Sequence, residues 1–386
     1  MLEKSLLCVE TALAQAEVPS LTNALKEFTT ATCNCLFDMI SSKYGSFVGR
    51  RLLCILSGRD VSSFPRNRKA AVESNDAKGN EPLNAKLQET DIMPRKRQIG
   101  DLATRVGDGT IQSKAHANII TVPHPELLKD IVQVVSSSEW TGPELVELVT
   151  GPFSGPFFQS LVLATVETNF CSSLIYRLLG GSAAGGSSSV TSDMLLSLMT
   201  DKGGSHMVEV ALTAAPEDIF QKLCSTAFKG RITSLAQHPT ANFAVQAALG
   251  SVRKPAQLKR MCEDLCPAIS SLLRARRGGV VVTLLAACKR LGIKQKEVAN
   301  TVWDAIATTG EDCANPVVSL LCLDTVNSDL SSKSGKRLSP IGCAALITML
   351  QFPADAPARW SKAIARLQPE EVLTIARDPE GCHSLE

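Results

Sequence analysis

Two amides and a flat ring, Asn242, Gln246 and Phe243, interrupt the otherwise apolar stretch 241–249. The amides are four residues apart, so a helix would place both on one face with the ring beside them. An amide pair offers donors and acceptors to the edge of a nucleic-acid base, and a ring can stack on its face. The same side chains could instead cap the start of a helix. Base recognition and helix capping therefore both stay open for this group.

A second group joins Ser205 and Glu209 to the ring of His206 at the same spacing. A carboxylate accepts two N–H bonds from guanine and disfavours bases that lack them. The spacing His206-x-x-Glu209, which recurs as His383-x-x-Glu386, is also half of a metal-binding motif. No further ligand is placed nearby in sequence, so we expect neither a metal site nor a catalytic residue here.

These groups belong to a motif that repeats along the chain. It consists of a small residue followed by five positions, of which the first and the fifth are often polar. The small residue is Gly204, Ala241 and Gly278 in three successive copies, which are separated by intervals of 37 residues. A two-helix unit of this length cannot bury its apolar face alone, so neighbouring units must stack into a solenoid with the second helices along one surface. Related copies begin at Gly45, Gly155, Gly342 and Gly381.

Helical periodicity dominates the segments that are not rich in Gly, Ser or Pro, and the one strand-like run, 280–282, continues as an apolar pattern to Ala287. The sequence therefore predicts an all-α solenoid. We divide it into N-terminal helical repeats (1–57), a polar, disordered, basic insertion (58–104), and further helical repeats (105–386) that contain a flexible loop at 180–189. The chain stops within the motif that begins at Gly381, which suggests truncation.

Charge is nearly balanced, with a formal net charge of +2 over 386 residues. Binding to nucleic acid would therefore need a local basic surface. Arg274, Arg276 and Arg277 precede the motif at Gly278, where their guanidinium groups could meet phosphates; solvated loop charge is the alternative. The basic clusters 66–69 and 95–97 in the insertion suit nuclear import, RNA tethering or plain solvation.

Cysteine usage and the lack of long apolar runs indicate the compartment. The 13 cysteines are scattered, mostly in apolar runs, and an odd number without a framework indicates buried, reduced thiols. The run 280–288 is far shorter than the about 20 residues of a membrane span, and the stretch 1–17 lacks the apolar core of a secretory signal. We expect a soluble intracellular protein that does not contact membranes.

The motifs resemble those of the Pumilio (PUF) repeat family of RNA-binding proteins. The stretch 242–246 is similar to the family's uracil-reading pattern, 205–209 to its guanine-reading pattern, and 382–386 to a guanine-type variant. The resemblance implies that positions one and five hydrogen-bond a base edge while position two stacks between bases. With the three arginines, the candidate RNA-binding residues are Ser46, Phe47, Arg50, Ser205, His206, Glu209, Asn242, Phe243, Gln246, Arg274, Arg276, Arg277, Cys382, His383 and Glu386.

Other copies depart from the reading pattern, which argues against contiguous reading of a long strand. They place Pro156, Phe157 and Ser160, or Gly279, Val280 and Thr283, or Cys343, Ala344 and Ile347, at positions one, two and five. The stretches 43–61, 274–291 and 340–350 are similar to the nucleolar Pumilio-like proteins of the nucleolar protein 9 class, which include plant Pumilio members. This resemblance implies binding to pre-ribosomal RNA during small-subunit maturation in the nucleolus, with pre-ribosomal proteins as partners.

Three other readings compete with this one. A HEAT- or armadillo-like protein-binding scaffold shares the stacked helices, but such scaffolds do not require Asn and Gln, or Ser and Glu, around a ring. A PUF-type regulator of messenger RNA would share the reading chemistry. An enzyme has little support, because 180–189 lacks the Lys and the strand context of a phosphate-binding loop. We expect no catalysis, no cofactor and no small-molecule substrate.

Overall fold

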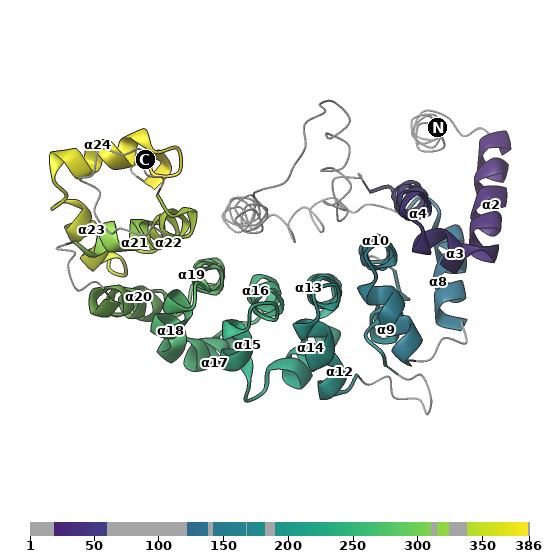
Figure 1. Ribbon diagram of the computed structural model, residues 1–386, viewed down its shortest axis with the longest axis horizontal. Coiled ribbons are helices and arrows are strands. Elements are labelled where there is room, and N and C mark those ends of the chain that lie inside the picture. The colour runs from purple at the N-terminus through teal and green to yellow at the C-terminus, as the bar shows by residue number, and fades with distance from the viewer. Residues whose placement is uncertain are drawn as a thin grey trace, which may run out of the picture. The chain divides into compact units, whose positions relative to one another are not determined.

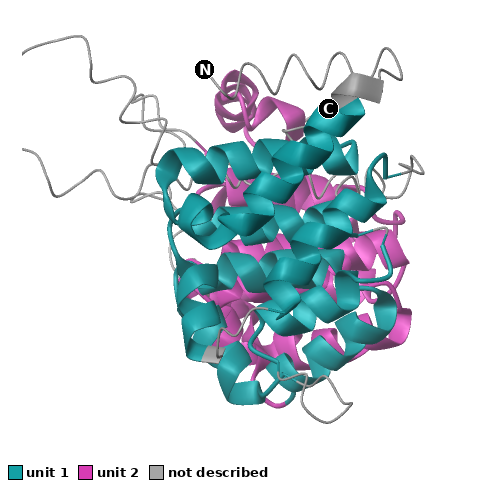
Figure 2. Ribbon diagram, turned by 90° about the vertical axis from the view of Figure 1, so that its right-hand side faces the viewer, with its two compact units in different colours: residues 1–82, 118–229 teal, residues 83–117, 230–386 magenta. Residues whose placement is uncertain are grey.

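The computed structural model describes residues 19–59, 122–137, 142–166, 168–181, 190–309, 315–323 and 338–384. Every regular element in these ranges is a helix (Figure 1), which confirms the predicted all-α class. The chain forms two compact units: unit 1 comprises 1–82 and 118–229, and unit 2 comprises 83–117 and 230–386 (Figure 2). The predicted insertion from residue 60 onward, with its basic clusters, and residues 182–189 of the predicted loop lie outside the described residues.

Unit 1 is built from helical repeats in which the motif lies on the third helix. The helices α4, α10 and α13, here called motif helices, pack against one another in that order, and each follows directly on a shorter partner, α3, α9 or α12. Figure 1 shows α10 and α13 in one row and α9, α12 and α14 in another. The elements are α2 (Pro19–Asn34), α3 (Leu36–Ser41), α4 (Lys43–Ser57), α8 (Pro125–Ser137), α9 (Gly142–Thr150), α10 (Ser154–Ala164), α11 (Cys171–Leu178), α12 (Ser192–Thr200), α13 (Gly204–Ala214) and α14 (Glu217–Phe228).

Unit 2 continues the same plan with the motif helices α16, α19 and α22, which also pack in that order. The run 280–282 lies within α19, so it is helical as predicted. The elements are α15 (Ile232–Gln237), α16 (Asn242–Ser251), α17 (Pro255–Leu265), η3 (Cys266–Ala268), α18 (Ile269–Arg274), α19 (Gly278–Leu291), α20 (Gln295–Thr309), α21 (Pro316–Leu321), α22 (Pro340–Leu350), α23 (Ala358–Ile364), α24 (Pro369–Arg377) and η4 (Cys382–Ser384).

The repeat contains three helices, so the two-helix unit expected from the sequence is wrong. In unit 2, for example, α17, α18 and α19 form one repeat and α20, α21 and α22 the next. The middle helices α15, α18 and α21 have only six residues each. Fewer than two turns give too little periodicity to separate such a helix from a turn by sequence pattern.

A polar side chain caps the start of most motif helices, three residues before the small residue of the motif. In α13 the carboxylate of Asp201 accepts hydrogen bonds from the backbone N–H groups of Gly203 and Gly204, at 2.8 and 2.6 Å. Before α16, Nδ1 of His238 accepts from two backbone N–H groups, both at 3.1 Å. These bonds satisfy first-turn amides that have no partner within the helix. The other capping side chains are Ser42, Ser339 and Asp378.

The small residue of the motif is required by a close approach between backbones. A Cβ atom at Gly45 would lie 2.0 Å from the carbonyl oxygen of Met39, and one at Gly342 would lie 2.0 Å from that of Leu320. Each carbonyl belongs to the short helix that precedes the motif helix. The first turn of the motif helix therefore rests directly on the backbone of its partner, which fixes where the five motif positions point.

The cysteines of the described ranges are free thiols, most of them buried, in agreement with the sequence expectation. Burial raises the pKa of the Cys224 thiol to about 12 and that of the Cys343 thiol to about 12. Such thiols are protonated at neutral pH and pack as small apolar groups. Among the described helices, none is long and apolar enough to cross a membrane.

We expect Gly342→Ala to destabilise the protein by about 2–3 kcal/mol, because the added methyl group would collide with backbone that cannot move aside. Gly250→Ala in α16 of the same unit is the matched control, since nothing lies within 4 Å of its added Cβ. The control should stabilise the helix by about 0.5–1 kcal/mol. Urea unfolding measures both changes, and equal stability of the two variants would contradict the proposed backbone contact.

Candidate nucleic-acid interface

The amide pair of α16 is organised by the turn that precedes the helix. Both N–H bonds of the Asn242 amide point to backbone carbonyls, His238 O at 2.8 Å and Pro239 O at 2.9 Å. Its oxygen accepts a 2.8 Å bond from Nε2 of Gln246. Asn242 therefore braces the start of α16, which realises the capping alternative for this residue. The second N–H and the carbonyl oxygen of Gln246 remain available for a ligand.

The neighbouring repeat in unit 2 leaves room for this glutamine. A Cβ atom on Gly279 of α19 would lie 2.9 Å from Oε1 of Gln246 and 3.1 Å from its Nε2. The Gln246 side chain is therefore packed against α19 and retains only 8% of its exposure. It lies at the boundary between α16 and α19, with its amide held on both sides.

In α13 the His206 and Glu209 side chains are more exposed than the amide pair of α16. Ser205 is buried, and its hydroxyl donates a 3.3 Å bond to the carbonyl of Lys202. Nδ1 of His206 lies 3.3 Å from Oε1 of Glu209, with half of the imidazole and 28% of the carboxylate side chain exposed. Oε1 of Glu209 is itself buried, so the ring and the remaining exposed part of the carboxylate are what a base face and a base edge could meet here.

In α4 the corresponding side chains form a stacked pair. The guanidinium of Arg50 lies 4.6 Å from the centre of the Phe47 ring, and its Nε donates a 3.4 Å bond to the carbonyl of Ser46. The hydroxyl of Ser46 donates a 2.6 Å bond to the carbonyl of Phe153, at the start of α10. This bond joins two neighbouring repeats of unit 1 at the start of their motif helices.

Across these helices, positions one and two differ in exposure. The residues at position one, Ser46, Ser205 and Asn242, are all buried. At position two, Phe47 and Phe243 are half-buried and His206 is exposed. The helix start therefore hides the first polar residue and presents the ring, so position two offers the larger stacking surface.

The motif on α10 is shifted by one residue from the register expected from the sequence. In the other capped helices the position-one N–H donates to the carbonyl four residues earlier, as Ser205 does to Asp201 at 3.0 Å. On α10 the residue with this bond is Gly155, which donates to Gly151 at 2.9 Å. Pro156 then occupies position two and Gln159 position five, instead of Phe157 and Ser160.

Gln159 is therefore a candidate reading residue that the sequence reasoning missed. Its side chain is 6% exposed, close to the value of Gln246. Phe157 is 1% exposed and fills the space beside Gly49 of α4, where a Cβ atom would lie 2.9 Å from its ring. The glutamine four residues after Gly155 was the available signal, but the repeated Gly-Pro-Phe of 151–157 aligns equally well in two registers.

The motifs on α19 and α22 carry no reading chemistry, as their sequences suggested. Thr283 is buried and its hydroxyl donates to the carbonyl of Gly279 in its own helix at 2.8 Å. Val280 at position two is fully buried. On α22, Cys343 and Ala344 belong to the core. These two helices support the stack rather than a base.

The three arginines lie in the turn between α18 and α19 and have different roles. Arg274 and Arg276 are exposed. Arg276 has a φ of +58°, a left-handed conformation that ends α18 with N–H bonds from residues 276 and 277 to its last turn. Arg277 is half-buried, and its Nε donates a 3.1 Å bond to the carbonyl of Gln237 in the preceding repeat. Arg274 and Arg276 therefore present their charge to solvent, whereas Arg277 helps to join two repeats.

The last motif is described only in part. Residues 382–384 form the short 3₁₀ helix η4, which packs against α22. The Cys382 thiol donates a 3.3 Å bond to the carbonyl of Pro379, and His383 is exposed. Glu386, predicted at position five, lies outside the described residues.

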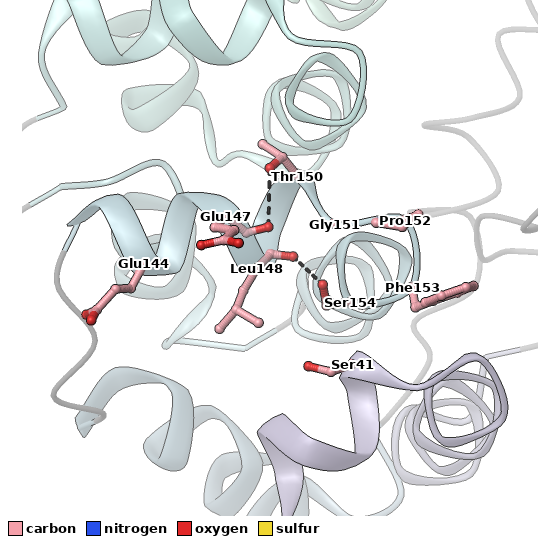
Figure 3. Close-up of a pocket in the computed structure, with 9 residues that line it drawn as sticks. All are labelled: Ser41, Glu144, Glu147, Leu148, Thr150, Gly151, Pro152, Phe153 and Ser154. Atoms are coloured by element: carbon pink, nitrogen blue, oxygen red, sulfur yellow. Dashed lines mark hydrogen bonds between the residues drawn. The ribbon is translucent and has the colours of Figure 1, made fainter.

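A pocket opens beside the α9–α10 turn of unit 1 (Figure 3). The hydroxyl of Ser154 donates to the carbonyl of Leu148 at 2.5 Å and thereby joins the start of α10 to the last turn of α9. Glu144 and Glu147 line the pocket and are exposed. Two carboxylates repel phosphate, so we do not assign this pocket to the nucleic-acid interface.

Stacked three-helix repeats, with a polar pair and a ring at the start of the third helices α4, α13 and α16, define a helical-repeat protein of the PUF type. The profile of the NOP9-like PUF repeat domain matches residues 8–386, and the chain belongs to that family. The family is one of Pumilio-like RNA-binding proteins, as the sequence motifs predicted.

Relatives and solved structures agree with this assignment. Nucleolar protein 9 of Homo sapiens is 23% identical over 376 residues, which cover 92% of this chain and 53% of the relative. Pumilio homolog 23 of Arabidopsis thaliana is 27% identical over 197 residues, 50% of this chain and 26% of the relative. The chain thus spans between about a quarter and about half of these relatives. The solved structure of APUM23-GGAAUUGACGG shares the fold, with a TM-score of 0.77 at 23% identity, and the match covers 100% of this chain and 66% of that chain.

We expect Asn242→Ala to lower the free energy of unfolding by about 1–3 kcal/mol, because two turn carbonyls and the Gln246 amide lose a partner. Asn300→Ala in α20 of the same unit is a matched control that removes another half-buried amide. Urea denaturation measures both variants. If Asn242→Ala cost no more than the control, the bracing role of Asn242 would be wrong.

Proposed function

We propose that this chain binds unpaired RNA through the first turns of its motif helices. The observation that carries the proposal is the arrangement of side chains at the start of α4, α13 and α16. Each places a ring at position two beside a polar side chain at position five, and the pairs are Phe47 with Arg50, His206 with Glu209, and Phe243 with Gln246. Stacking on such rings contributes about 1–3 kcal/mol per base and tolerates any base.

Base choice would come mainly from position five. Gln246 keeps a carbonyl oxygen and one N–H for a base edge, as uracil recognition needs. Glu209 offers a partly exposed carboxylate to the N–H groups of guanine. Arg50, already stacked on one face of Phe47, adds a cation behind the ring whose other face a base would cover. Gln159 extends the proposed set to α10.

We further propose that the RNA is pre-ribosomal and that the protein acts in the nucleolus during maturation of the small subunit. The names of the relatives, nucleolar protein 9 among them, support this location. The motif helices α19 and α22 carry no reading group, which suits recognition of short unpaired stretches more than a long strand. We propose pre-ribosomal proteins as further partners and binding without catalysis.

A protein-binding scaffold is the main competitor. Such a scaffold would account for the stacked helices but would not require rings beside a carboxylate, an amide or a guanidinium at matching positions. RNA recognition does require this combination, because unpaired bases offer a flat face and a polar edge together. Direct binding to RNA separates the two functions.

Gln246→Ala should weaken RNA binding by about 1–3 kcal/mol and relax base choice at one nucleotide, because position five loses its base-edge contact. The probe is GGAAUUGACGG, with GGAACUGACGG and GGAAUCGACGG as single uracil replacements, in a filter-binding assay. Gln295→Ala, at the start of α20 in the same unit, is the matched control and should bind like wild type. Equal discrimination by wild type and Gln246→Ala would reject the reading role.

Arg274→Gln combined with Arg276→Gln should weaken binding to all three RNAs alike, because phosphate contacts carry no sequence information. The slope of log affinity against log salt concentration should fall in magnitude by about 1.4, about 0.7 for each phosphate lost. Arg277 is left intact because it also joins two repeats.

The control for this experiment removes the same charge elsewhere in unit 2, with Lys259→Gln and Arg260→Gln on the exposed face of α17. An unchanged salt slope in the Arg274 and Arg276 variant, or an equal change in the control, would exclude specific phosphate contacts at the α18–α19 turn.

A further inference from the structure

Tyr44 is the most exposed of the large apolar side chains in the described part of the chain, at 77%. It lies in the first turn of α4, directly before the small residue Gly45 and therefore outside the five-residue motif. Gly203, Thr240 and Arg277 occupy the equivalent position before the motifs of α13, α16 and α19, and in the register set by Gly155 the half-buried Phe153 occupies it before the motif of α10. An exposed ring at this position is thus a particular feature of α4 among these helices.

The backbone that carries this ring is rigidly held. The N–H of the next residue, Gly45, donates a 3.0 Å bond to the Ser42 hydroxyl, and Gly45 itself rests on the backbone of α3. The hydroxyl of Ser46, two residues after Tyr44, donates a hydrogen bond to the carbonyl of Phe153. A ring on such a support loses only side-chain freedom when it binds, which lowers the entropy cost of stacking.

Tyr44 also lies in line with Phe47 and Arg50, of which Phe47 is half-buried and Arg50 is buried. The three residues are three apart in sequence, so each is the helical neighbour of the next along α4. Arg50 already covers one face of the Phe47 ring, at 4.6 Å. The sequence 43–57 contains three basic residues and no acidic one, so the surroundings of this row favour a polyanion.

We infer that Tyr44 stacks on an additional unpaired nucleobase, next to the one at Phe47 and outside the repeated reading positions. This inference rests on the proposed function and names a further RNA contact for it. Tyr44 and Phe47 then hold two consecutive bases by their faces, with Arg50 on the other face of the Phe47 ring, and Tyr44 reads no base edge. RNA is favoured over a protein partner because Tyr44 directly precedes the motif on α4 and the charged side chains of that helix are all basic.

The test compares three probes: GGAAUUGACGG, the same RNA with four uridines added at its 5′ end, and the same RNA with four added at its 3′ end. Wild type should bind one of the extended RNAs more tightly than the core RNA. Tyr44→Ala should lose that gain, with affinity for this RNA lower by about tenfold, and should keep the affinity of wild type for the other extended RNA. Fluorescence anisotropy measures the affinities, and circular dichroism verifies equal melting temperatures.

Two further substitutions separate stacking from apolar contact. Tyr44→Phe keeps the flat ring and should bind like wild type, whereas Tyr44→Leu keeps apolar bulk and should behave like Tyr44→Ala. Leu373→Ala on α24, which removes another exposed apolar side chain (52%), is the matched control and should have no effect.

The outcomes are distinguishable. If wild type binds RNA in a Gln246-dependent way but Tyr44→Ala binds every probe equally well, this inference fails and the proposed function stands. Full retention by Tyr44→Leu would also overturn it, because leucine cannot stack. If wild type binds none of the probes, both the proposed function and this inference fail, and an exposed Tyr44 would then fit a protein contact.

Discussion

The contact on which the rest of this structure depends is the approach of two backbones at the start of the motif helices α4, α13 and α22. A glycine or alanine there lets the first turn lie on the carbonyl of the short preceding helix, with no space for a larger side chain at Gly45 or Gly342. The nearby cap, such as Asp201 or His238, satisfies the amides that this approach would otherwise leave buried without partners. Together, the backbone contact and the cap fix how these motif helices are placed within their units.

This arrangement gives the motif positions one, two and five different roles. Position one lies so close to the capped turn that its polar group serves the fold first, as Asn242 does with the carbonyls of His238 and Pro239. On α4, α13 and α16 the side chain at position two is more exposed than the one at position one. Position five lies one helical turn after position one. In the proposed function, a PUF-type repeat of this chain builds its fold and its ligand surface from the same residues. The two demands can be separated only by measuring stability and binding side by side.

Much of the plan could be predicted because small residues and polar pairs recur at intervals of 37 residues and survive in the copies at Gly204 and Ala241. The short middle helices could not, since six residues contain too few apolar positions to show a period. The capping side chains could not be predicted from the sequence, because Ser, Asp and His perform the same role and no single residue type repeats. The register of α10 depended on one backbone bond, from Gly155 to Gly151, which sequence cannot show.

The packing of Gln246 against Gly279 makes the position of this amide depend on the next repeat. The missing side chain at Gly279 is what leaves space for the glutamine amide, so the orientation of a reading group is inherited from the following copy of the motif. Changing the position-five residue of one repeat alone would then fail wherever the residue that corresponds to Gly279 in the next repeat is larger than glycine.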